Sequence, residues 1–187
     1  LYGIGLEKDL PERFVPQLAG YRGMGPVRVG NQAAEHFQHD VYGNIVLGAA
    51  QAFHDHRLLH RAGLAEFKRL EQVGDNAVRV YGQPDAGMWE LRTRARVHTS
   101  SALMSWAACD RLSKIATVLG FPKRAFYWHQ HAQRMQAEIL EKSWSEERHA
   151  FAESFGGREL DASVLLMAEV GFIDPRDPRF VATVEAM

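Results

Sequence analysis

Residues 101–119 of this 187-residue chain, SALMSWAACDRLSKIATVL, predict a long helix. Apolar side chains recur at helical spacing along one side of it, namely Leu103, Trp106, Ala107, Leu112, Ile115, Ala116 and Leu119. The stretch Gly120-Phe121-Pro122 stops this helix, and a second helical pattern follows at residues 123–144. Two long helices with so short a connection predict an antiparallel hairpin.

Working outward from this hairpin, the same periodicity predicts helices at residues 31–54, 64–81 and 161–169 and from Phe180 onward. Asn31 is the predicted N-cap of the first of these, and Phe37 falls on its apolar side. Gly43 and Gly48 interrupt that helix at a cost of about 1 kcal/mol each relative to Ala. We therefore expect close packing at both glycines.

Strand signals are almost absent. Residues 1–30 are rich in Gly and Pro and predict a loop, with one short helical turn near Glu12. Residues 146–158 predict another loop, with a small hairpin around Phe151. The sequence therefore predicts an all-α fold built of antiparallel helical hairpins.

The composition excludes several classes of protein. Hydrophobic residues make up 46% of the chain, as in an ordinary globular protein. The 22 Lys and Arg nearly balance the 23 Asp and Glu, so the chain lacks the excess of basic residues that a nucleic-acid-binding protein carries. No apolar run is long enough to predict a membrane span. Cys109 is the single cysteine, which rules out an internal disulfide and favours a reducing, cytoplasmic location. We expect Cys109 to be a small core residue.

The loop at residues 83–90 carries the strongest chemical signal. A Pro-Asp-x-Gly turn leads directly into Trp89 and Glu90. This pair suits sugar chemistry, because an aromatic face packs on a pyranose ring while a carboxyl reaches the glycosidic oxygen. An apolar neighbour also raises a carboxyl pKa, as a general acid requires. The alternative, from spacing alone, is an ordinary turn with a buried Trp and a solvated Glu.

An ordered set of motifs resembles glycoside hydrolase family fifteen, in particular its bacterial glucoamylase-like and trehalase-like members. The motifs lie at residues 25–31, 38–43, 84–92, 101–111, 160–163, 170–172 and 177–179. The resemblance covers essentially the whole chain. It implies a six-hairpin α/α barrel, of which residues 1–187 would form the middle part of one catalytic domain, truncated at both ends.

The resemblance also implies an activity and a set of site residues. The activity is hydrolysis of α-glucosidic bonds with inversion and without a cofactor. Glu90 maps onto the general acid, and Arg28, Asn31 and Trp89 map onto positions that line a sugar subsite. Asp85 and Arg92 are further expected substrate-site residues that shape the same loop.

The general base of the family lies in a motif beyond these residues, so we expect the isolated chain to be inactive. Opening a barrel would expose apolar helix faces, and such faces favour self-association. His36, His39, Asn44 and Ala102 depart from the usual motifs near the subsites. The choice among trehalose, maltose and longer α-glucans therefore stays open, as does the identity of the base.

Other interpretations compete with the enzymatic one. His36, His39 and Asp40 would share one face of the helix predicted at 31–54, which could suggest a metal site. Zinc needs three or four ligands, so we expect that no metal is bound there. Asp161 is expected to cap a helix rather than act as a second acid, and Glu153 as a substitute base has no motif support. A catalytically degenerate helical module that binds carbohydrate or a partner is the alternative function.

Overall fold

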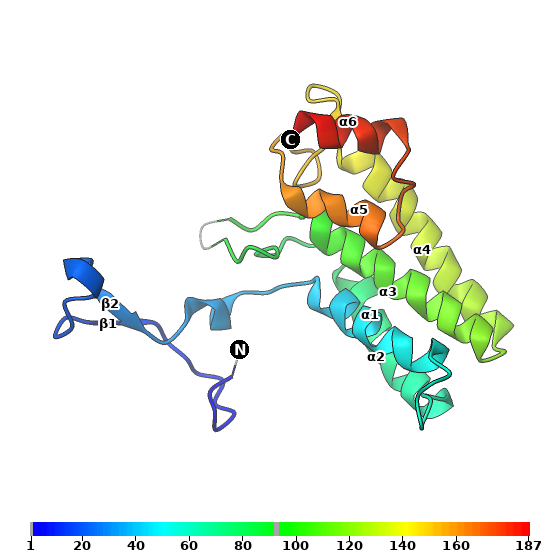
Figure 1. Cartoon of the computed structure of the whole chain (residues 1–187), viewed down its shortest axis with the longest axis horizontal. Coiled ribbons are helices and arrows are strands. Elements are labelled where there is room, and N and C mark those ends of the chain that lie inside the picture. Colours follow the sequence, from blue (N-terminus) through cyan, green and yellow to red (C-terminus); the bar gives the residue numbers. More distant parts are fainter. Residues whose placement is uncertain (1, 92–93) are drawn as a thin grey trace.

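The computed structural model describes residues 2–91 and 94–187, which form a helical body and an N-terminal arm that stands out from it (Figure 1). The body contains α1 (Val41–His54), α2 (Leu64–Val80), α3 (Thr99–Val118), α4 (Pro122–Lys142), α5 (Leu166–Glu169) and α6 (Pro178–Ala186). The strands of the described residues form two small antiparallel pairs, β1 (Arg13–Val15) with β2 (Val27–Val29) and β3 (Trp144–Ser145) with β4 (Ala150–Phe151). The all-α prediction is confirmed.

Helix α3 lies at the centre of the body, packed against α1, α2 and α4. The α1–α2 and α3–α4 pairs run antiparallel, as predicted (Figure 1). Every residue from Thr99 to Cys109 is buried, so the first half of α3 has neighbours on all sides rather than on one apolar side. The small Ala and Ser side chains of this stretch explain why, since they allow other helices to approach its backbone closely.

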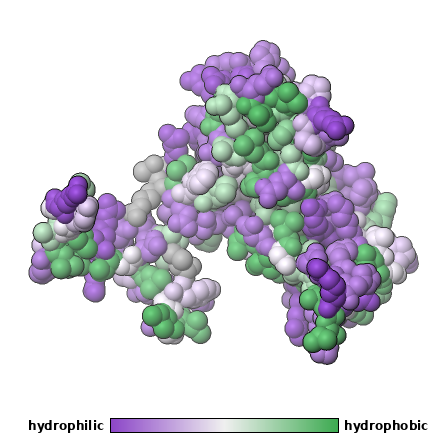
Figure 2. Space-filling model, in the orientation of Figure 1, coloured by the Kyte–Doolittle hydropathy of each residue, from purple (hydrophilic) through white to green (hydrophobic). Residues whose placement is uncertain are grey.

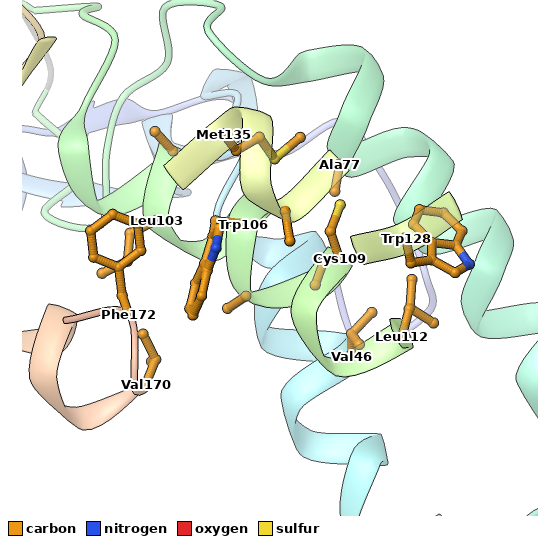
Figure 3. Close-up of a cluster of buried hydrophobic side chains, with 14 of the residues drawn as sticks. Val46, Ala77, Leu103, Trp106, Cys109, Leu112, Trp128, Met135, Val170 and Phe172 are labelled. Carbon is orange, nitrogen blue, oxygen red and sulfur yellow. The ribbon is translucent and has the colours of Figure 1, made fainter. Parts of the chain in front are cut away.

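The hydrophobic core gathers around the apolar side chains of α3 (Figure 3). Trp106 meets Phe172 edge to face, with ring centroids 4.9 Å apart. Cys109 is fully buried in the same core, and burial raises the pKa of its thiol to about 12. Cys109 is therefore an inert core residue, as predicted.

The two glycines of α1 have different roles. A Cβ at Gly43 would lie 2.2 Å from the backbone oxygen of Met104 in α3, so Gly43 permits the close approach of the two helices. A Cβ at Gly48 would meet nothing within 4 Å. The packing explanation is confirmed for Gly43 and is wrong for Gly48.

The helix predicted at 31–54 begins later than expected. Asn31 does act as a cap, since its side chain accepts a hydrogen bond from the backbone N–H of Ala33, but it caps only a 3₁₀ turn at Gln32–Glu35. Residues 36–39 are not helical, because backbone groups there bond to the loop at 85–87 instead. Phe37 is consequently 79% exposed rather than in the core.

The N-terminal arm also differs from the prediction. Instead of a helical turn near Glu12, Arg13–Val15 pairs with Val27–Val29 to form a short antiparallel ribbon. The predicted hairpin around Phe151 is confirmed as β3–β4. Asp161 and Asp177 cap the turns that follow them, at Ala162–Leu165 and at the start of α6. No helix within residues 2–91 and 94–187 is long and apolar enough to cross a membrane.

Candidate active site

A tight turn between α2 and α3 presents Trp89 and Glu90; we call residues 85–91 the Trp-Glu turn. Its start is fixed by two backbone hydrogen bonds between Asp85 and Arg96, of 2.9 and 3.2 Å. Gly87 has φ +67°, and its carbonyl oxygen accepts a hydrogen bond from the backbone N–H of Glu90 at 3.2 Å. Glu90 itself has φ +53°, a conformation that few non-glycine residues adopt.

Asp85 anchors the turn from inside the protein. Its side chain is 2% exposed, and its Oδ2 accepts hydrogen bonds from the backbone N–H of His39 and from the Ser101 hydroxyl, both at 2.8 Å. The turn is thereby tied to the segment before α1 and to the first turn of α3. Asp85 therefore anchors the turn from beneath, and its place among the substrate-site residues stays a prediction.

Trp89 is exposed but held in one orientation. Its indole Nε1 donates to both carboxylate oxygens of Asp161, at 3.0 and 2.9 Å, while 56% of the residue stays accessible. Asp161 Oδ1 also accepts from the backbone N–H of Ser163 at 2.8 Å. Partial burial would raise the pKa of Asp161, but hydrogen bonds from Ser163 and Trp89 lower it overall. The indole is thus fixed by an anionic cap and keeps apolar surface free.

Glu90 is exposed next to Trp89. Among the described residues, none donates a hydrogen bond to its carboxyl group. A pocket of about 390 Å³ lies at the base of the same turn. It is lined by Glu35, His36, Phe37, Pro84, Asp85, Ala86, Leu91, Arg94 and Ala95. The turn therefore offers an accessible carboxyl, an oriented aromatic ring and a neighbouring hollow.

Arg28 lies in β2 on the arm (Figure 1), and Asn31 caps the 3₁₀ turn at Gln32–Glu35. Arg28 Nη1 pairs with Glu12 Oε1 at 3.0 Å, and its guanidinium lies over the Phe14 ring, 5.6 Å from the centroid. The described contacts of neither Arg28 nor Asn31 reach Glu90. Their assignment to one sugar subsite stays a prediction, and Arg92 lies outside the described residues.

The helical face expected to hold His36, His39 and Asp40 does not exist, because His36 and His39 precede α1. Within residues 2–91 and 94–187, no three His, Cys, Asp or Glu side chains are grouped as metal ligands.

Burial, together with the nearby charge of Asp85, raises the pKa of Asp40.

The sequence patterns do not predict that His98 and Glu153 form a buried pair beneath the Trp-Glu turn. His98 is 4% exposed, and its Nδ1 lies 3.2 Å from Glu153 Oε1. Glu153 is 7% exposed, and its Oε2 lies 3.5 Å from Arg96 Nη1. No spacing rule connects His98 to Glu153, because only tertiary packing brings them together.

Comparison with known proteins gives a consistent result. The model of the family described as "Glycosyl hydrolases family 15" matches residues 7–187. The trehalase of Mycobacterium tuberculosis is 35% identical over 198 residues, which cover 100% of this chain and 27% of that protein. The trehalase of Thermoplasma volcanium is 32% identical, over 98% of this chain and 29% of its own length. Trehalase 2 of Sulfolobus acidocaldarius is 30% identical, over 93% of this chain and 30% of its own length.

The chain thus spans less than a third of the length of each of these relatives. No solved structure gives a significant match.

Proposed function

Because the chain belongs to glycosyl hydrolases family 15, we propose that it is part of an enzyme that hydrolyses an α-glucosidic bond with inversion. The observation that carries this proposal is the Trp-Glu turn, which exposes the Glu90 carboxyl beside an indole fixed by Asp161. Trehalose is the first substrate to test, since the relatives compared above are named trehalases. Maltose and longer α-glucans are the next candidates.

In this proposal Glu90 is the general acid, which protonates the glycosidic oxygen as the bond breaks. The exposed face of Trp89 packs against or beside a glucose ring. Arg28, Asn31 and Arg92 donate hydrogen bonds to sugar hydroxyls, while Asp85 holds the turn from beneath. No cofactor takes part.

An inverting mechanism needs a second carboxylate about 6.5–9.5 Å from the first, with a water molecule between that base and the sugar. We assign this base to a part of the protein outside residues 1–187. The isolated chain is then inactive, and residues 1–187 form the middle of one α/α-barrel domain. A cytoplasmic location rests only on the single cysteine and remains a prediction.

The test is glucose release by the full-length protein, with wild type and Glu90→Gln assayed side by side on trehalose, maltose and longer α-glucans. Glu90→Gln is expected to lower kcat by several orders of magnitude, because the amide cannot donate the proton. Polarimetry should show that the glucose attacked by water is released in the inverted, β configuration, so that trehalose gives one β-glucose and one α-glucose. Glu146→Gln, an exposed carboxylate on the β3–β4 turn, is the matched control and should keep the wild-type rate.

Three results would count against the proposal. An unchanged rate for Glu90→Gln would remove Glu90 from the chemistry. A product with retained configuration would exclude the inverting mechanism. Binding of α-glucosides without any turnover by wild type would instead favour a degenerate carbohydrate-binding module.

A further inference from the structure

The imidazole of His98 supports the Trp-Glu turn from beneath. A Cβ added at Gly87 would lie 2.8 Å from His98 Cδ2 and 2.9 Å from its Nε2, so the ring packs directly against the Gly87 backbone. The carbonyl of that same glycine accepts the hydrogen bond from Glu90 N–H. A displacement of the ring therefore reaches Glu90 through a single residue.

The orientation of this ring is fixed by Glu153. His98 Nδ1 lies 3.2 Å from Glu153 Oε1, and because a carboxylate only accepts hydrogen bonds, this contact favours the imidazole form that carries its proton on Nδ1. Glu153 is held in turn by Arg96, and its carbonyl oxygen accepts a hydrogen bond of 2.7 Å from the backbone N–H of Thr99. His98 and Glu153 are thus locked to each other by side chain and backbone.

Packing alone does not account for an imidazole at this position. His98 Nε2 is buried and has no hydrogen-bond partner among the described residues. An unsatisfied buried polar atom is unfavourable, and an apolar ring such as Phe would fill the space without it. What His98 offers and Phe lacks is a ring nitrogen, Nδ1, beside the Glu153 carboxylate.

We propose that His98, oriented by Glu153, is a positioning residue that sets the Trp-Glu turn so that Glu90 can protonate the leaving oxygen. This inference rests on the proposed function of Glu90. Since a displacement of about 1 Å in a reacting group can lower a rate about 100-fold, a buried ring one residue from the acid is well placed to control it.

The experiment uses the full-length protein and two substrates that differ in their need for an acid. Trehalose has a poor leaving group that must be protonated. In α-glucosyl fluoride the leaving group is the fluoride ion, which departs without much help from an acid. His98→Gln is expected to lower kcat on trehalose roughly 10- to 100-fold and kcat on the fluoride by less than about threefold. His129→Gln, at an exposed histidine of α4, should change neither rate.

Variants of Glu153 test the same inference if substitution of His98 prevents folding. Glu153→Gln keeps an oxygen that can accept from His98 Nδ1–H, so it should retain more trehalose activity than Glu153→Ala, which removes the acceptor. In a Glu90→Gln background, His98→Gln should add little further loss, because the two changes act on the same step.

The inference is overturned if folded His98→Gln loses the same factor in kcat on both substrates, or loses none on trehalose. It is also overturned if Glu153→Gln and Glu153→Ala have the same kcat on trehalose. Those results would leave the proposed function intact. Failure of wild type to hydrolyse either substrate would instead overturn the proposed function, and this inference with it.

Discussion

The indole Nε1 of Trp89 donates to both carboxylate oxygens of Asp161, a residue 72 positions further along the chain. This contact ties the Trp-Glu turn to the cap of the 3₁₀ turn at Ala162–Leu165. Two separate motifs of the sequence are therefore one structural unit. The orientation of the aromatic ring depends on a residue that was expected to be only a helix cap.

Asp161→Ala is expected to weaken substrate binding. Loss of a hydrogen bond to a charged group frees the indole to rotate, and we expect KM for the cleaved glucoside to rise about tenfold. Steady-state kinetics of the full-length protein measure this change. The matched control is Asp174→Ala, which also removes a carboxylate that accepts from a backbone N–H, here that of Arg176. An equal rise in KM for both variants would contradict the role given to Asp161.

Asp40→Asn is expected to stabilise the protein at neutral pH but not in acid. Burial and the charge of Asp85 raise the pKa of Asp40 above its ordinary value of 3.8. The folded state therefore holds this proton more tightly than the unfolded chain does, and stability declines as the pH rises from 3.8 through the raised pKa. The amide cannot ionise, and its oxygen can still accept from Asn44.

The expected gain in Tm at pH 7 is about 1–2 °C, because solvent screens a half-exposed group, and no gain is expected at pH 3. Thermal denaturation at the two pH values measures it. Asp9→Asn, at an exposed aspartate of the arm, is the control. A gain that is the same at both pH values would show that the effect is not electrostatic.

Gly43→Ala and Gly48→Ala are expected to change stability in opposite directions. The new methyl group at position 43 would overlap the Met104 carbonyl and force α1 away from α3, which should cost about 1–3 kcal/mol. At position 48 the methyl group meets open space, so the better helix propensity of Ala should add up to about 1 kcal/mol. Urea denaturation compares the two, and equal losses would refute the difference in packing.

The 187-residue chain is expected to self-associate. Hydrophobic side chains lie on the surface of the arm as well as on the helical body (Figure 2), including Phe14 at 61% and Phe37 at 79% exposure. Light scattering should therefore give a concentration-dependent mass above 21.1 kDa. The double change Phe14→Ser and Phe37→Ser should lower that mass. A monodisperse monomer at all concentrations would contradict the prediction.

Local sequence patterns are enough to predict the helices of the body and the place of the Trp-Glu turn. Helical periodicity and end signals are local, so the bounds predicted for α2, α3 and α4 lie within about two residues of those observed. The Pro-Asp-x-Gly pattern likewise predicts a turn, because its glycine adopts a positive φ at no steric cost.

Contacts between distant segments override some of these local patterns. Asn31 has the side chain of a helix cap, yet α1 begins at Val41, because the Phe37 carbonyl and the His39 N–H bond to the loop at 85–87 rather than within a helix. The same holds for the pairs that support the site. Trp89 with Asp161 and His98 with Glu153 are distant in sequence, and they meet only because the fold brings the segments that carry them together.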